Sequence, residues 1–337
     1  MESVGVQESS SQNPDVANKG DKETKFVYPD SFYPKFLNEI KDQDVVLFFK
    51  YYISGVEINE SLLDSFTSFI INEENSPLVE QILHSNLLKH YPTSKSNRIQ
   101  VLKRIIARLS FQSIFNDTLF EALSNAIITK NDGGYSYRSF IDMKKGGVIV
   151  VRKMDALVTF GTTGMTCWRA SAVLAEYISR FCDFDDKNLL ELGAGCGLSG
   201  IAAAKYHNVK NLYFTDRSEQ VLEQLNENIR INFPEESRNI TIQKLDWDHF
   251  NEEELLVSPD IILGADLLYN ENSFPGLCSA LKKLLTKHDS YAIFAHNIRN
   301  RCTLETFFDV ELARHNLKPK RICQALLPKD EKGIDFF

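Results

Sequence analysis

The stretch from Leu189 to Gly200, LLELGAGCGLSG, constrains the fold more than any other part of the sequence. It consists of a short apolar run ending in Glu191, a loop containing Gly193, Gly195 and Gly197, and a following segment with helical character. A glycine-rich loop lets the backbone turn sharply and approach a ligand with no Cβ in the way. We therefore expect a strand, a loop and a helix that together hold a nucleotide-like cofactor.

The identity of that cofactor depends on Glu191. The spacing of Gly195, Gly197 and Gly200 satisfies the G-x-G-x-x-G pattern of dinucleotide-binding proteins. A carboxylate two residues before the first glycine would, however, repel a pyrophosphate. S-adenosylmethionine carries no phosphate, and its ammonium and sulfonium groups are cationic. The stretch favours a methyl donor, with a dinucleotide and a ligand-free tight turn as the alternatives.

Composition excludes several other classes of protein. The chain has 337 residues and is 43% hydrophobic, which suffices for a substantial core. No apolar run approaches the ~18 residues that cross a bilayer, and the first residues lack the apolar core of a signal peptide. We therefore expect a cytoplasmic monomer that does not bind a membrane. The net charge of −8 argues against direct binding to nucleic acid, and the six scattered cysteines predict no metal site.

The pattern of apolar residues divides the chain into four parts. Residues 1–25 are polar and are expected to be disordered. Residues 26–130 have helical spacing and predict a helical N-terminal subdomain. Residues 131–160 change to a period of two and predict a β-hairpin that bridges to the rest. Residues 161–337 are assigned to the cofactor-binding domain.

Two features of the helical part give local predictions. Asn59 is expected to cap one helix, and Thr118 with Glu121 predicts a capping box for the last one. One helix also carries a charged face that could be either a docking site or a solvated surface; its residues are Arg98, Lys103 and Arg104.

Strands and helices alternate after the glycine loop, which predicts a mainly parallel sheet with helices on both faces. Ligands of such sheets bind at the carboxyl ends of the strands. Acidic residues stand at four of these predicted ends: Glu191, Asp216, Asp246 and Asp266.

Each of these acids suits one part of the expected cofactor or the reaction. Asp216, about 20 residues past the glycine loop, is placed to accept hydrogen bonds from the two ribose hydroxyls. Asp246 could accept a hydrogen bond from the adenine amino group, while Trp247 provides an aromatic wall. Asp266 could orient an amine, which must be neutral to attack a methyl group, and Tyr269 could line the slot or hydrogen-bond there. Each of them could instead have an ordinary structural role.

With these residues in view, the chain resembles the seven-β-strand protein-lysine methyltransferases. The resemblance rests on five motifs: Thr163-Gly164 with Trp168, the glycine loop from Glu191 to Gly200, Thr215 to Arg217, Leu245 to Trp247, and Gly264 to Tyr269. It implies an α/β fold of the Rossmann-like class I methyltransferase type, with a seven-stranded sheet ending in an antiparallel hairpin. It also implies donor contacts by Trp168, Glu191, Gly193, Gly195, Asp216, Asp246, Trp247 and Ala265, and a D-x-x-Y signature with Asp266 and Tyr269 in the catalytic roles.

The helical extension, with residues 87–98, is most similar to the branch that methylates a lysine of eukaryotic translation elongation factor 2. The leading hypothesis is therefore an S-adenosylmethionine-dependent protein-lysine N-methyltransferase acting on that factor. The alternatives are another protein substrate, such as a chaperone or a different translation factor, and a donor-binding scaffold without catalysis.

Overall fold

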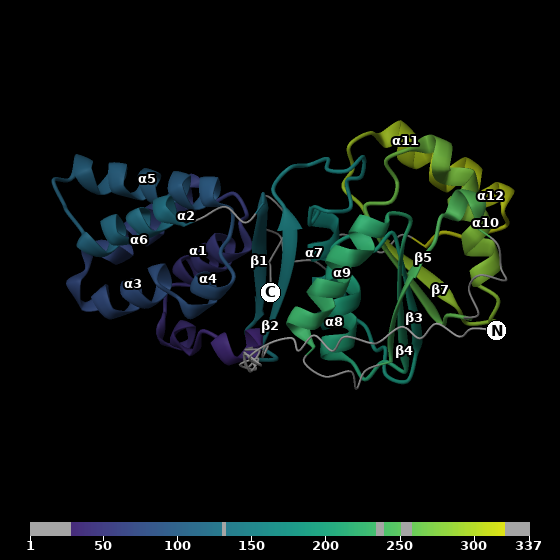
Figure 1. Cartoon of the computed structure of the whole chain (residues 1–337), viewed down its shortest axis with the longest axis horizontal. Helices are drawn as coiled ribbons and strands as arrows, with labels where there is room; N and C mark the ends of the chain where they lie inside the picture. The colour runs from purple at the N-terminus through teal and green to yellow at the C-terminus, as the bar shows by residue number, and fades with distance from the viewer. Residues whose placement is uncertain (1–27, 130–132, 234–238, 251–257, 321–337) are drawn as a thin grey trace, which may run out of the picture.

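The computed structural model describes residues 28–129, 133–233, 239–250 and 258–320. The predicted tail at residues 1–25 lies outside these ranges, as does the end of the chain, where a final hairpin was expected. Between residues 43 and 128 the chain forms six α-helices (Figure 1). They are α1 (Gln43–Ser54), α2 (Glu60–Ile71), α3 (Ser76–Leu83), α4 (Asn86–His90), α5 (Lys95–Phe111) and α6 (Asp117–Ile128).

The caps of these helices confirm one prediction and correct another. The side chain of Asn59 accepts the Leu62 N–H at 2.9 Å and caps α2, as predicted. The capping box predicted for α6 is wrong, because the Asn116 side chain accepts the Leu119 N–H at 3.1 Å and the helix begins at Asp117. Asn116 thus starts the helix before Thr118, which lies inside its first turn.

A β-hairpin follows the helices, as the change of period predicted. Strands β1 (Tyr135–Asp142) and β2 (Gly147–Met154) pair antiparallel, with Ile141 opposite Val148. The hairpin lies between the helical part and the larger sheet (Figure 1).

Side chains from other elements bind the edge of β2 that faces away from β1. On α9 (Glu219–Asn232), Asn232 accepts the Val150 N–H at 2.9 Å and donates to the Val150 carbonyl at 2.6 Å. Asn228 makes the same pair of bonds with Arg152, at 2.6 and 3.1 Å. At the two ends of the strand, Asp30 accepts the Val148 N–H and the Met165 carbonyl accepts the Met154 N–H. The hairpin is thereby fixed to the cofactor-binding part.

The described part of the larger sheet has five parallel strands in the order β5-β4-β3-β6-β7. Their bounds are β3 (Asn188–Leu192), β4 (Asn211–Asp216), β5 (Ile240–Lys244), β6 (Ile261–Ala265) and β7 (Tyr291–Ala295). This arrangement confirms the predicted α/β fold. The final hairpin of a seven-stranded sheet would fall on residues 321–337, which are outside the described ranges.

Helices cover both faces of the sheet, because alternate residues of each strand point to opposite sides. In β3, Leu189 joins the core formed with α7 (Arg169–Phe181), α8 (Leu198–Tyr206) and α9. Leu190 and Leu192 join a second core with α10 (Phe274–Leu284). The second core also contains Phe307, from a C-terminal helix made of α11 (Arg301–Glu305), a π-helical turn (Thr306–Glu311) and α12 (Leu312–Arg314). None of the helices in the described ranges is both long and apolar enough to span a membrane.

Candidate active site at the carboxyl edge of the sheet

The four predicted acids lie along one edge of the sheet, on four neighbouring strands. Asp216 is the last residue of β4, Glu191 is next to last in β3, and Asp266 directly follows β6. Asp246 begins the short 3₁₀ turn that follows β5. Parallel strands end at the same edge, so the structure gathers these residues from a stretch of more than seventy positions.

The glycine loop occupies a space that has no room for side chains. Gly193 and Gly195 have φ angles of +57° and +54°, which L side chains rarely adopt. A Cβ at Gly193 would lie 2.6 Å from Leu267 Cδ2 and 3.3 Å from the Trp247 ring. At Gly195 it would lie 3.2 Å from the Gly164 carbonyl oxygen. The loop therefore presents bare backbone at the centre of the edge.

Glu191 supports this loop from beneath. Its side chain is only 1% exposed, and the carboxylate accepts the Gly200 N–H at 2.9 Å. Burial raises the pKa of Glu191 to about 8, against the lowering effect of the Gly200 hydrogen bond. Glu191 thus ties the strand to the first turn of α8.

Asp216 lies between the glycine loop and the next helix. Its carboxylate accepts the Gly195 N–H at 3.2 Å and the Ser218 N–H at 3.1 Å, and the residue is 8% exposed. Burial raises the pKa of Asp216, while these backbone donors act in the opposite direction. Two bonds leave part of the acceptor capacity of a carboxylate free, which suits ribose hydroxyls.

Asp246 and Trp247 form the outer part of the edge. Asp246 accepts the Asp248 N–H at 3.2 Å and faces His249 Nδ1 at 3.1 Å. Partial burial raises the pKa of Asp246, but the hydrogen bonds from His249 and Asp248 together lower it below its ordinary value. Trp247 places its ring beside Gly193, where it forms an apolar wall.

Trp168 stands at the N-terminus of α7, next to the loop that joins this helix to β2. Its indole N–H donates to the Thr163 carbonyl at 2.9 Å. The guanidinium of Arg299 lies 5.3 Å from the centre of the Trp168 ring. Trp168 therefore connects the Gly161–Gly164 loop to the loop after β7.

Asp266 has an unusual backbone and a charged partner. Its φ is +58°, and its N–H donates to the Ala295 carbonyl at 2.7 Å. The carboxylate accepts two hydrogen bonds from Arg299, at 3.1 and 2.6 Å. Ala265, the preceding residue, is the last of β6 and is half-buried against the glycine-loop side of the core.

Tyr269 lies at the end of the D-x-x-Y segment and is 54% exposed. The intervening Leu267 and Leu268 are buried in the core on the α10 side. The segment thus anchors two apolar side chains and leaves the tyrosine at the surface.

Arg299 was missed in the sequence. It lies 33 residues beyond Asp266, in a loop with no recognisable motif. Only the rule that the loops after β6 and β7 meet at one edge could have suggested the contact.

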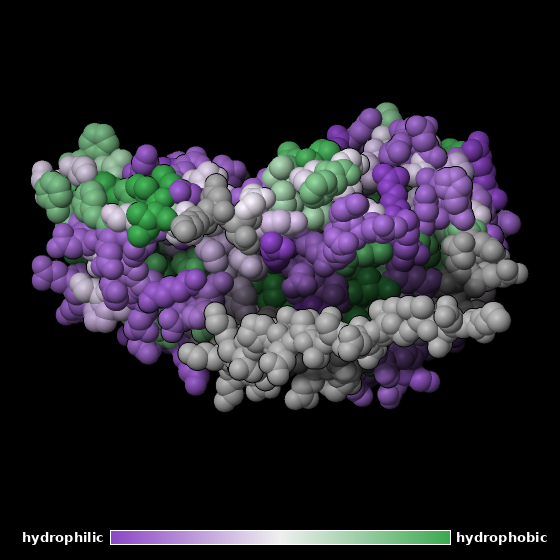
Figure 2. Space-filling model, in the orientation of Figure 1, coloured by the Kyte–Doolittle hydropathy of each residue, from purple (hydrophilic) through white to green (hydrophobic). Residues whose placement is uncertain are grey.

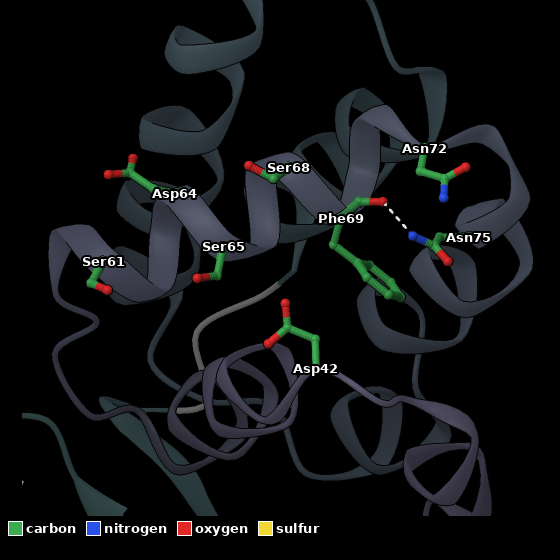
Figure 3. A pocket seen from close by; sticks show the side chains of 8 residues that line it. All are labelled: Asp42, Ser61, Asp64, Ser65, Ser68, Phe69, Asn72 and Asn75. Carbon is green, nitrogen blue, oxygen red and sulfur yellow. Dashed lines mark hydrogen bonds between the residues drawn. The ribbon is translucent and has the colours of Figure 1, made fainter.

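Two other groups of polar residues lie apart from this edge. A hollow of about 690 Å³ between α2 and the start of α1 is lined by Asp42, Ser61, Asp64, Ser65, Ser68, Phe69, Asn72 and Asn75 (Figure 3). Asp183, Asp185 and His207 bring their ligand atoms within 4.8 Å of one another. Asp183 and Asp185 there accept backbone N–H groups and His207 Nε2 contacts the Ile178 carbonyl, so loop structure already accounts for these atoms.

The residues at the carboxyl edge fit S-adenosylmethionine. The loop turns through positive φ angles at Gly193 and Gly195, Asp216 follows it with spare acceptor capacity, and the Trp247 ring stands beside it. No cluster of lysine or arginine side chains lies on the glycine loop itself, as a pyrophosphate would favour.

Comparison with known proteins gives a consistent result. Residues 157–313 match the family model described as lysine methyltransferase. The human protein-lysine N-methyltransferase EEF2KMT is 29% identical over 283 residues, covering 77% of this chain and 85% of the human protein. Its mouse counterpart is 30% identical over 246 residues, covering 69% of this chain and 73% of the mouse protein. Protein-lysine N-methyltransferase EFM3 of Chaetomium thermophilum is 31% identical over 173 residues, which cover 49% of this chain and 52% of that protein.

Proposed function

Because this chain belongs to the lysine methyltransferase family, we propose that it methylates a lysine of translation elongation factor 2. The chain is an S-adenosylmethionine-dependent protein-lysine N-methyltransferase, and the proposal concerns its substrate. It is supported by the similarity to proteins named EEF2KMT, which covers 77% of this chain for the human protein and 81% for the bovine one.

The residues at the carboxyl edge divide the work of binding and positioning. When bound, S-adenosylmethionine supplies a methyl group on a positively charged sulfur. Asp216 would accept hydrogen bonds from the ribose hydroxyls, and Asp246 with Trp247 would hold the adenine. The backbone at Gly193 and Gly195 would border the methionine end, with Glu191 holding the loop in shape. Asp266 orients the incoming amine, and most of the acceleration comes from this positioning.

Exposed apolar side chains beside this edge favour a protein as the methyl acceptor. In the loop between β2 and α7, Leu157, Val158 and Phe160 are 63%, 63% and 70% exposed. Phe160 stands at the tip of a tight turn, with φ of +53°, closed by two 3.0 Å hydrogen bonds between Thr159 and Thr162. Figure 2 shows apolar surface over this loop, and a large exposed apolar group is typical of a contact with another protein.

The helical part offers a second surface for recognition. Its α5–α6 pair exposes five large apolar side chains: Phe111, Phe115 and Phe120 around the turn between the two helices, and Ile127 and Ile128 at the end of α6. Figure 2 shows apolar surface over the helical part, on the side of the molecule away from the larger sheet. The basic face of α5 is a weaker candidate, because Arg104 pairs with Glu60, Arg108 pairs with Asp64, and Arg98 is buried.

The observation that carries the proposal is the row of acids around a bare glycine loop in a chain similar to EEF2KMT proteins. The test is incubation of the purified chain and labelled S-adenosylmethionine with purified elongation factor 2, followed by mass spectrometry of every lysine. We expect one lysine to gain label. Asp266→Ala should abolish incorporation, whereas Asp289→Ala, at an exposed site away from the edge, should not. Labelling of a different protein in a lysate, with none of the factor, would refute the proposed substrate.

A further inference from the structure

Arg299 makes the closest charged contact with Asp266 in the described part of the chain. The two side chains meet in a bidentate ion pair, with distances of 3.1 and 2.6 Å. Asp266 is 7% exposed at its side chain and Arg299 is 45% exposed. A planar guanidinium held by two bonds on one side and by the Trp168 ring on another has a defined position.

This contact affects the amine that the reaction needs. A lysine ammonium has no lone pair, so it must give its proton to solvent water before it can attack. The neutral nitrogen then gives its lone pair to the methyl carbon while the carbon–sulfur bond breaks and its electrons stay on sulfur. A lone carboxylate beside the amine would stabilise the ammonium form and delay this step.

We propose that Arg299 is a positioning residue that cancels the charge of Asp266, so that the slot does not favour the protonated target lysine. The inference rests on the proposed function, since it concerns the amine of a protein substrate. Asp266 keeps its capacity to orient that amine by hydrogen bonding. Arg299 acts on the reaction through Asp266 and through its place over Trp168.

Other titratable groups around Asp266 do not take over this role. Tyr269 and Glu271 follow β6, His296 follows β7 and Arg169 begins α7. Glu191, whose pKa burial raises to about 8, lies on the neighbouring strand β3 and is bonded to the Gly200 N–H. The Glu271 carboxylate accepts the Thr303 hydroxyl at 2.7 Å, and the His296 ring lies 5.9 Å from that of Phe308. Neither Tyr269 nor Arg169 has an ion pair with Asp266 in the described structure.

The test is the dependence of the methylation rate on pH, at saturating S-adenosylmethionine and elongation factor 2. We compare the full chain with Arg299→Gln, Arg299→Lys and, as a control, Arg301→Gln. Arg301 is an exposed arginine two residues away, at the start of α11. In Arg299→Gln, the rising part of the pH–rate profile should shift to higher pH by about one unit. Such a shift corresponds to a tenfold change in the protonation equilibrium of the amine. Its rate should be about tenfold lower along the rising part of the profile and should approach that of the unaltered chain only on the plateau above it. Arg299→Lys should retain most of the rate, and Arg301→Gln should match the unaltered chain.

A double variant separates this role from simple support of the fold. Asp266→Asn/Arg299→Gln removes both charges. The rising part of its pH–rate profile should therefore lie at the same pH as in the unaltered chain, even though its rate is low. An equal loss of rate at every pH in Arg299→Gln, or a profile that does not shift, would overturn the inference while leaving the function in place. Absence of methylation by the unaltered chain would instead refute the proposed function, and the inference with it.

Discussion

The Glu191 carboxylate and the Gly200 N–H are joined by a 2.9 Å hydrogen bond that is sealed from solvent. Strand β3 enters the glycine loop and helix α8 follows it, and this bond ties the end of the strand to the first turn of the helix. An acid that the sequence places at the mouth of a ligand site is therefore also part of the frame of that site.

Stability should depend on pH through Glu191. Burial raises its pKa from 4.5 to about 8 in the folded chain, so the folded state binds the proton more tightly than the unfolded state. The free energy of unfolding should therefore fall as pH rises from about 4.5 to about 8, by up to ~1.4 kcal/mol per pH unit. Glu191→Gln keeps an acceptor for the Gly200 N–H and removes the titrating group. Its free energy of unfolding, measured in urea at pH 5, 6.5 and 8, should therefore fall less steeply with pH. Parallel curves for the two proteins would contradict this assignment, and Glu227→Gln, at an exposed site, serves as the control.

Asp216→Asn should weaken the binding of S-adenosylmethionine. The variant removes the charge that strengthens hydrogen bonds to the ribose, which are worth about 1.5–3 kcal/mol when one partner is ionised. We expect an increase in Kd of roughly 10- to 100-fold, measured by titration calorimetry. Asp289→Asn should bind as the unaltered chain does, and equal affinities for all three proteins would remove Asp216 from the cofactor site.

Gly193→Ala should impair both folding and cofactor binding. The new Cβ would lie 2.6 Å from Leu267, at a φ of +57°. Gly146→Ala provides a matched control, because its φ is +70° but no atom lies within 4 Å of the added Cβ. Gly146→Ala should lose about 1–2 kcal/mol of stability from backbone strain alone and bind the donor normally. Normal donor binding by Gly193→Ala would show that the loop does not border the ligand.

Phe160→Gly should raise the KM for the protein substrate several-fold without changing the Kd for S-adenosylmethionine. Glycine adopts the positive φ of this turn easily, so the variant removes the ring and leaves the turn intact. Val310→Ala, at a 40% exposed apolar site on the C-terminal helix, is the control. An unchanged KM would exclude the loop before α7 from substrate contact.

Asn232→Ala should lower the free energy of unfolding by more than the substitution of an ordinary exposed polar residue does. It removes the partners of both backbone groups of Val150, which are buried, and each unsatisfied group costs about 1–3 kcal/mol. Asn226→Ala, on the same helix and without a side-chain hydrogen bond in the described structure, should change stability by less than about 0.5 kcal/mol. Urea unfolding of the two variants tests the difference.

The sequence predicts the strands of the larger sheet well because most of them are short apolar runs with a polar residue at or near the end. The four acids lie at or just after the ends of their strands, as expected. The side on which Glu191 lies could also have been predicted, since residues alternate and Leu190 and Leu192 face α10.

Other features depend on contacts between distant residues, which a single sequence does not reveal. The ion pair of Asp266 with Arg299 requires the loops after β6 and β7 to lie side by side. The N-cap of α6 is Asn116 and not Thr118, a choice between two polar residues that the sequence pattern does not make. The internal use of Arg104 needs α2 and α5 to pack side by side. Composition and periodicity contain no information about such choices.

The bonds along the outer side of β2 have a consequence for how the molecule behaves in a crowded cell. The outer edge of a two-stranded ribbon normally carries a row of unpaired backbone N–H and C=O groups. A strand of a neighbouring chain can pair with this row, which is a route to aggregation. Here Asp30, Asn228, Asn232 and Met165 already bind that row at Val148, Arg152, Val150 and Met154. Loss of these amides should therefore be visible first as self-association of the hairpin, before any change in the chemistry at the sheet edge.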